Sequence, residues 1–220
     1  MLIIATDLTE DQKNQSIGTA SMKITHLRVQ NFKSIIDTGK ISIGELCCLV
    51  GKNEAGKTAT LTALQSLRPF GQAMTTYDVT EDYPRRFATR YDERHPHFDA
   101  SVVETWWELS EEASGLLVDE FGEDAITGRE FTISKRYKQE NTSWTLPISE
   151  QKAIESAIAE QRLNAVEKKV VENATTVTEL IAAVGRQESP SEKLSALSNR
   201  FSGYRQCSGS APNGQICLIG

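Results

Sequence analysis

The chemistry-bearing residues of this chain gather in one short run, Gly51-Lys52-Asn53-Glu54-Ala55-Gly56-Lys57-Thr58. The run matches the pattern G-x-x-x-x-G-K-[ST], in which a glycine-rich turn lets several backbone N–H groups converge on one phosphate. Lys57 supplies a point charge for the β- and γ-phosphate oxygens, and the Thr58 hydroxyl supplies one ligand to Mg²⁺. The run therefore predicts a site for ATP with Mg²⁺, whose predicted binding residues here are Gly51, Asn53, Glu54, Ala55, Gly56, Lys57 and Thr58.

Such a loop needs a strand before it and a helix after it, and the sequence predicts both. Residues 46–50 form an uninterrupted apolar run, which is typical of a strand buried on both faces. After the loop, Leu61, Leu64 and Leu67 recur at helical spacing until Pro69 ends the pattern. The helix would point its positive N-terminal end at the phosphates.

Composition sets the broad class. With 220 residues, 39% hydrophobic and 25% charged, the chain suits a soluble globular protein of one domain, or of one domain with an appendage. The four cysteines show neither a disulfide framework nor zinc spacing, which favours a reducing, cytoplasmic location. No signal sequence or membrane span is recognisable. Because the net charge is −6, any contact with nucleic acid must be local.

The fold class expected is mixed α/β, in four regions. Residues 1–21 read as a flexible extension and residues 22–148 as the lobe that carries the phosphate loop. Strands are expected at 23–32, 40–43 and 100–109, with a hairpin over 131–146 and an irregular stretch at 69–96. Residues 149–200 show helical periodicity of the coiled-coil or insertion type, and residues 201–220 show no periodicity and are expected to be unstructured.

A second nucleotide signature would be an apolar strand that ends in an acidic residue. Residues 116–120, Leu-Leu-Val-Asp-Glu, match its letters. The periodicity instead favours a helix that begins after Ser110 and ends at Gly122, because apolar residues recur at helical spacing between them. Asp119 and Glu120 are therefore not predicted to be site residues.

Two segments together resemble a known family. Residues 24–35, which include Asn31-Phe32-Lys33-Ser34, and the loop at 49–58 resemble the N-terminal half of the SMC/RecF/OLD group of ABC-type ATPases. That group begins with a strand reading roughly L-x-I-x-N-F-[KR]-S, followed by a short loop and the phosphate loop. The motif-level resemblance covers residues 23–70. Beyond it, only the order of a hairpin followed by helices is similar.

The resemblance implies an ATPase head in DNA repair, DNA maintenance or defence. Two heads would sandwich ATP as a homodimer, with DNA and a nuclease partner or fused nuclease domain as further expected partners. Lys33 would be the basic residue that approaches the nucleotide. In the family a C-terminal half supplies an S-G-G-type signature, the acidic strand end and a switch histidine. None of these follows the helical region here, so the chain alone is expected to bind ATP without efficient turnover.

Several alternatives remain open at this point. The chain could be a free-standing P-loop kinase or NTPase that uses Asp119, or a non-hydrolysing regulatory subunit. Gln139 is interpreted as a residue of a solvated hairpin turn rather than as the Mg²⁺-sensing glutamine of the family. Arg85 and Arg86 could contact phosphate, but the neighbouring acidic residues, Glu81 and Asp82, favour a solvated, salt-bridged loop.

Overall fold

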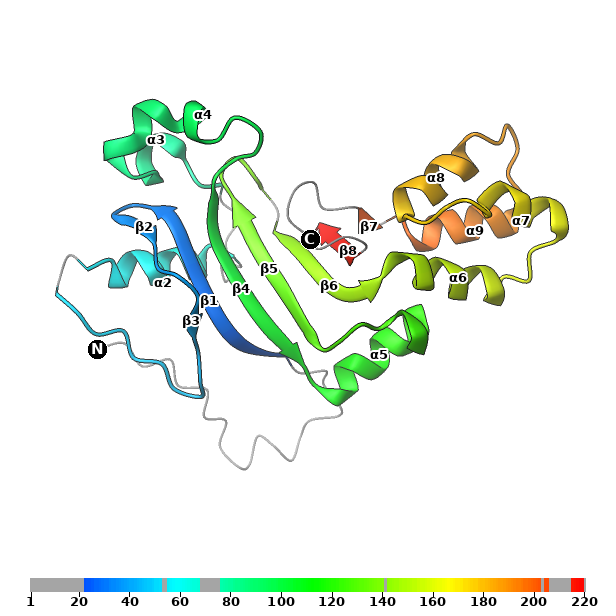
Figure 1. The fold of residues 1–220 in the computed structure, drawn as a ribbon, viewed down its shortest axis with the longest axis horizontal. Coiled ribbons are helices and arrows are strands. Elements are labelled where there is room, and N and C mark those ends of the chain that lie inside the picture. The colour runs from blue at the N-terminus through cyan, green and yellow to red at the C-terminus, as the bar shows by residue number, and fades with distance from the viewer. Residues whose placement is uncertain are drawn as a thin grey trace. The chain divides into compact units, whose positions relative to one another are not determined.

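The structure, a computed structural model, describes residues 22–52, 55–67, 76–140, 142–202, 204–205 and 215–219. The chain divides into two compact units, whose helices and strands are labelled in Figure 1. Unit 1 contains Met1–Glu108 and Thr132–Thr142, and unit 2 contains Leu109–Phe131 and Ser143–Gly220. Strands and helices occur in both units, so the predicted mixed α/β class is confirmed.

Two short strands pair with the first strand of unit 1, β1 (Met22–Phe32). It pairs antiparallel with β2 (Ile35–Asp37) through a tight turn, with Phe32 opposite Ile35, and with β3 (Ile41–Ser42), with Leu27 opposite Ile41. Leu27 and Val29, which are two residues apart and therefore on one face of the strand, are both buried. On the outer face, the Arg28 guanidinium forms an ion pair with Asp37 at 2.6 Å.

The strand β4 (Ser101–Leu109) lies next to β1, and β5 (Glu130–Arg136) follows it in the strand order. Both strands were predicted within two residues of their observed ends. Val102 and Val103 are fully buried, and the Thr105 hydroxyl donates to the Ile133 carbonyl at 3.0 Å. On β5, alternate residues Ile133 and Lys135 are buried, which is the two-residue period of a strand.

Residues 76–96 are not irregular as expected. They form α3 (Val79–Asp82), the 3₁₀ helix η1 (Arg85–Arg90) and α4 (Tyr91–Arg94), while residues 69–75 of the same expected stretch lie outside the described part. Short helices such as these show no useful periodicity, since each has only about one turn. Their stability comes from buried aromatic side chains rather than from local sequence.

Four tyrosines form the centre of this part of unit 1. Tyr77, Tyr83, Tyr91 and Tyr137 are each at most 5% exposed. The ring centroid of Tyr137 lies 5.8 Å from the ring centroids of Tyr83 and Tyr91, and 5.9 Å from that of Tyr77. Burial raises the pKa of Tyr77 and of Tyr137, so both stay neutral hydrogen-bond donors. The Tyr137 hydroxyl donates to the Asn31 carbonyl at 2.7 Å, which ties the cluster to the end of β1.

In unit 2, α5 (Glu111–Phe121) is followed by η2 (Glu123–Ala125), β6 (Ser143–Ser149) and α6 (Glu150–Glu160). Gly122 connects α5 to η2 with φ 89, and a β-carbon at that position would lie 2.5 Å from the Ser156 hydroxyl oxygen. Glycine is therefore required where α5 packs against α6.

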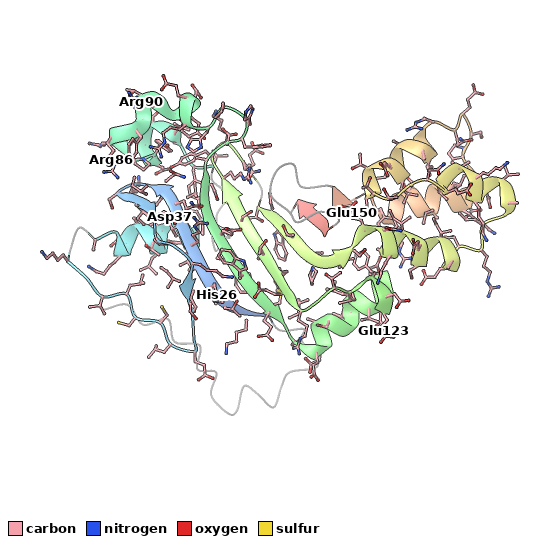
Figure 2. All side chains as sticks on the ribbon, viewed as in Figure 1. His26, Asp37, Arg86, Arg90, Glu123 and Glu150 are labelled. Atoms are coloured by element: carbon pink, nitrogen blue, oxygen red, sulfur yellow. The ribbon has the colours of Figure 1, made fainter. Side chains whose placement is uncertain are left out.

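The helical region continues with α7 (Ala165–Val171), α8 (Val177–Gly185) and α9 (Glu192–Arg200). All four helices, α6 to α9, lie in the region of predicted helical periodicity, residues 149–200. Both α7 and α8 begin with a capping box, from Asn164 and Thr176. Glu150 (labelled in Figure 2) is 2% exposed and accepts the Val177 backbone N–H at 2.9 Å, and burial raises its pKa. The four helices have at most 11 residues each, so they form a compact appendage rather than a long coiled coil.

The expectation of an unstructured tail is corrected by two strands within it, β7 (Tyr204–Arg205) and β8 (Gln215–Ile219). β8 pairs antiparallel with β6, with Trp144 opposite Leu218, and β7 pairs with β8. These strands depend on a partner more than 60 residues away, which a local pattern cannot reveal. Among the described residues, no helix has both the length and the apolar character needed to cross a bilayer.

Candidate nucleotide-binding site

The phosphate loop leads directly into α2 (Lys57–Gln65), which packs against β1. Gly56 precedes the helix in the left-handed conformation, with φ 84. Within the loop, the Ala55 backbone N–H donates to the Lys52 carbonyl at 3.0 Å. The predicted site residues Asn53 and Glu54 lie outside the described residues.

Gly56 is required for two reasons. Its positive φ is unfavourable for residues with a β-carbon. A β-carbon there would also lie 2.9 Å from Ile35 Cγ1 and 3.6 Å from the Ser34 hydroxyl oxygen. The tight turn between β1 and β2 therefore packs directly against the start of α2, so the two segments of the family resemblance, distant in sequence, lie together.

Lys57 extends back across the loop. Its ammonium group donates to the Gly51 carbonyl at 2.7 Å and to the Lys52 carbonyl at 2.6 Å. An ammonium group has three N–H donors, so these two contacts hold the charge over the loop and leave donor capacity for a phosphate oxygen.

The N-terminus of α2 is open to an anion. Among the residues that the structure describes, no side chain caps it, and its first turn contains no acidic residue. The first N–H groups of a helix have no acceptor within the helix, and together with the helix dipole they favour a phosphate. Thr58 is exposed in this first turn, so the structure leaves its hydroxyl accessible for the predicted bond to Mg²⁺.

The other end of α2 meets a buried cation. Lys135 on β5 is fully buried, and its ammonium group donates to the Ser66 carbonyl at the end of the helix, at 3.3 Å. Burial lowers the pKa of Lys135. A positive charge at the C-terminal end complements the helix dipole. Sequence reading missed this residue, because an isolated lysine in a strand normally points to solvent.

Lys33 lies in the turn beside the loop but contacts another segment. Its ammonium group forms an ion pair with Asp82 at 2.7 Å and donates to the Glu81 carbonyl at 3.2 Å. Its backbone N–H donates to the Asp82 carbonyl at 2.6 Å, and its φ is 52. From the sequence, Asp82 was expected to pair with the neighbouring arginines, whereas it pairs with Lys33, which is 49 positions away. The neighbouring residues Ser34 and Ile35 place Lys33 close to the phosphate loop.

The buried strand predicted before the loop does not form. Residues 46–50 have no regular secondary structure, Leu46 is 66% exposed and Val50 is 88% exposed. Cys47 is half-buried and Cys48 is exposed. A strand requires hydrogen-bonding neighbours, and among the described residues no strand pairs with this segment. The apolar run therefore remains an unpaired, exposed segment beside the phosphate loop.

The acidic letters at 116–120 fall on a helix, as predicted. The Ser110 hydroxyl accepts the Ala113 backbone N–H, and α5 ends before Gly122. Glu120 forms an ion pair with Arg200 at 3.3 Å and therefore has a structural partner. Gln139 accepts the Arg136 backbone N–H at 3.1 Å in the hairpin turn, in agreement with the turn interpretation. Among the described residues, no three His, Cys, Asp or Glu side chains gather into a metal site.

Comparison with known proteins gives one family for the chain. A family model described as an AAA ATPase domain matches residues 22–199. The match includes the phosphate loop, the strands of unit 1 and the helices of unit 2. No curated protein and no solved structure showed significant similarity to the chain.

Proposed function

Because the chain belongs to the AAA ATPase domain family and is in general terms a nucleotide-binding ATPase, we propose that residues 51–58 bind ATP with Mg²⁺. We propose further that the chain forms the head of an SMC/RecF/OLD-like ATPase in DNA repair, DNA maintenance or defence. The observation that carries the site is the Lys57 ammonium group, which two loop carbonyls hold beside the uncapped start of α2.

The proposed roles follow from this geometry. Lys57 would exchange a loop carbonyl for β- and γ-phosphate oxygens, and the N–H groups at the start of α2 would bind the same phosphates. Thr58 would donate its hydroxyl oxygen to Mg²⁺, which neutralises charge on the β- and γ-phosphates when it is bound. In hydrolysis, water attacks the γ-phosphorus, the bond to the bridging oxygen breaks, and ADP leaves with phosphate.

We propose that turnover needs groups that these residues do not provide. The acidic letters at 116–120 lie on α5, so they give no support to a free-standing kinase or NTPase that uses Asp119 as an acidic strand end. The exposed segment at 46–50 supports a structural partner next to the loop. A C-terminal half, or a partner that carries one, would supply the missing groups, and two heads completed in this way would hold ATP between them as a homodimer. DNA and a nuclease remain the proposed further partners.

Titration calorimetry with ATP tests the site. We expect the chain to bind ATP more tightly with Mg²⁺ than without it, and Thr58→Ala to lose about tenfold in affinity only when Mg²⁺ is present. Thr62→Ala is the matched control, because Thr62 is an exposed threonine one turn further along α2. Equal affinities for both variants and the unmodified chain in Mg²⁺ would refute the role of Thr58. Undetectable ATP binding by the unmodified chain would refute the site itself.

Turnover by the isolated chain is a separate expectation. Phosphoryl transfer requires a positioned water, Mg²⁺ ligands and charge around the γ-phosphate, and the loop provides only part of this set. Phosphate release should therefore stay far below about 1 per second, the low end of ordinary enzymatic rates. A rate of that order from a monomer, measured across a concentration series, would show that the head needs no partner. A rate that never rises with any partner would favour a non-hydrolysing regulatory subunit.

A further inference from the structure

The short helical segment of unit 1 contains four arginines in a stretch of ten residues, 85–94. The exposed residues Arg85, Arg86, Arg90 and Arg94 lie on η1 and α4, and residues 85–94 are called the arginine face below. Figure 2 shows Arg86 and Arg90 at the surface of this segment. With Asp92 and Glu93 as the acidic residues of the range, four positive and two negative charges leave +2, whereas the whole chain carries −6.

The acidic residues that were expected to neutralise these arginines do not do so. Asp82 pairs with Lys33 instead, at 2.7 Å. Arg90 and Glu93 approach to 3.9 Å with side chains 72% and 77% exposed, which makes a weak ion pair. Within the described part of the chain, Arg85, Arg86 and Arg94 form no ion pair. Three exposed guanidinium groups of one ten-residue segment thus have no ion-pair partner among the described residues.

One aromatic ring orders two of the guanidinium groups. The guanidinium carbon of Arg86 lies 4.6 Å from the ring centroid of Phe87, and that of Arg94 lies 4.0 Å from it. Stacking on a ring restrains an arginine side chain. It leaves the N–H donors of the guanidinium group free for bidentate hydrogen bonds to an oxyanion. Phe87 therefore reduces the conformational entropy that the two arginines lose when they bind.

The arginine face rests on a rigid base. Tyr83 and Tyr91 flank η1, both are buried, and their ring centroids are 4.9 Å apart. The Tyr83 hydroxyl lies 3.0 Å from His95 Nε2. The Tyr91 hydroxyl donates to Asp99 at 3.1 Å, and burial raises the pKa of Tyr91 to about 12, so the phenol stays protonated near neutral pH. The segment is therefore anchored at both ends of η1.

We propose that the arginine face binds the phosphate backbone of nucleic acid. Several fixed, unpaired guanidinium groups complement a ligand with many phosphates in a row, and duplex DNA carries about one negative charge per 1.7 Å of its axis. The alternative ligand is an acidic protein segment, whose carboxylates lie on mobile side chains. The experiment below includes this alternative as a competitor. This proposal rests on the proposed function, because it assigns the surface at which the ATPase would bind DNA. Binding at the arginine face requires no ATP.

Fluorescence anisotropy with a labelled DNA duplex, without nucleotide and over a series of salt concentrations, tests the proposal on the full chain. The variant Arg86→Gln/Arg94→Gln should bind at least about tenfold more weakly at low salt. Its slope of log affinity against log salt should be smaller by about 1.8, because each lost phosphate contact removes about 0.9. The matched control is Arg162→Gln/Arg186→Gln, which removes the same charge from two exposed arginines of unit 2 and should bind like the unmodified chain.

Three outcomes would overturn the proposal. The first is that the unmodified chain binds no duplex even at low salt. The second is that the control variant loses as much affinity as the test variant, and the third is that a polyglutamate peptide of equal charge competes as well as unlabelled duplex. Equal circular dichroism spectra establish that the variants are folded. ATP titration of the same samples separates the two proposals, since a chain that binds duplex but not ATP keeps the arginine face and refutes the nucleotide site.

Discussion

Replacing Lys57 with alanine should weaken ATP binding at least about 30-fold, which corresponds to about 2 kcal/mol for a lost charge-assisted contact. The Lys57 ammonium group is the cation that the loop carbonyls of Gly51 and Lys52 hold in place. Without it, the triphosphate would keep only the backbone N–H groups and the dipole of α2. Titration calorimetry in Mg²⁺ measures the difference directly.

Lys52→Ala provides the control for this experiment. Lys52 lies in the same loop and is exposed, and it contacts Lys57 through its backbone carbonyl, which the substitution preserves. Its loss removes the same unit of charge without removing the positioned cation. Similar losses of ATP affinity in both variants would mean that ATP binding depends only on the overall positive charge of the loop. The specific role assigned to Lys57 would then be wrong.

Phe32→Ala should give the largest loss of stability, about 3–5 kcal/mol, because it removes a buried aromatic ring and leaves a cavity. Phe32 is 2% exposed at the end of β1, and its ring contacts that of Tyr77 edge-on, with centroids 5.5 Å apart. The residue thus joins the strand to the tyrosine cluster. Urea denaturation, followed by near-ultraviolet circular dichroism of the aromatic cluster, should show the lower midpoint.

Phe98→Ala is the matched substitution at a surface position, because Phe98 is 50% exposed. It should cost less than about 1.5 kcal/mol, since roughly half of the apolar area is already in contact with water. If the two variants unfolded at the same urea concentration, Phe32 would not anchor the cluster. The aromatic residue of the family-like segment would then have a role other than packing.

Local signals predicted the features that depend on neighbours in sequence. The spacing around Gly56 and Lys57 predicted both the turn and the start of α2, because the backbone geometry of this loop is set by its own glycines. The helical stripe after Ser110 likewise identified α5 against a misleading match of letters. In each case the decisive contacts lie within about four residues of one another.

Features that depend on distant partners were missed. The apolar letters at 46–50 indicate a strand, but a strand forms only where another strand is available to pair with it. The Lys33–Asp82 pair and the packing of Tyr137 among the tyrosines likewise join segments that the chain separates widely. The spacing of residues along the chain does not reveal such contacts.

The exposed segment at 46–50 has a consequence for how copies of the chain meet. It is bounded by Glu45 on one side and Lys52 on the other, so the run has opposite charges at its two ends. Two copies that align antiparallel bring each glutamate towards the other copy's lysine, whereas in-register parallel alignment places like charges together. This asymmetry makes antiparallel pairing of two such segments electrostatically more favourable than parallel pairing, and charged residues at the ends of an apolar run act as gatekeepers against the stacking of further copies.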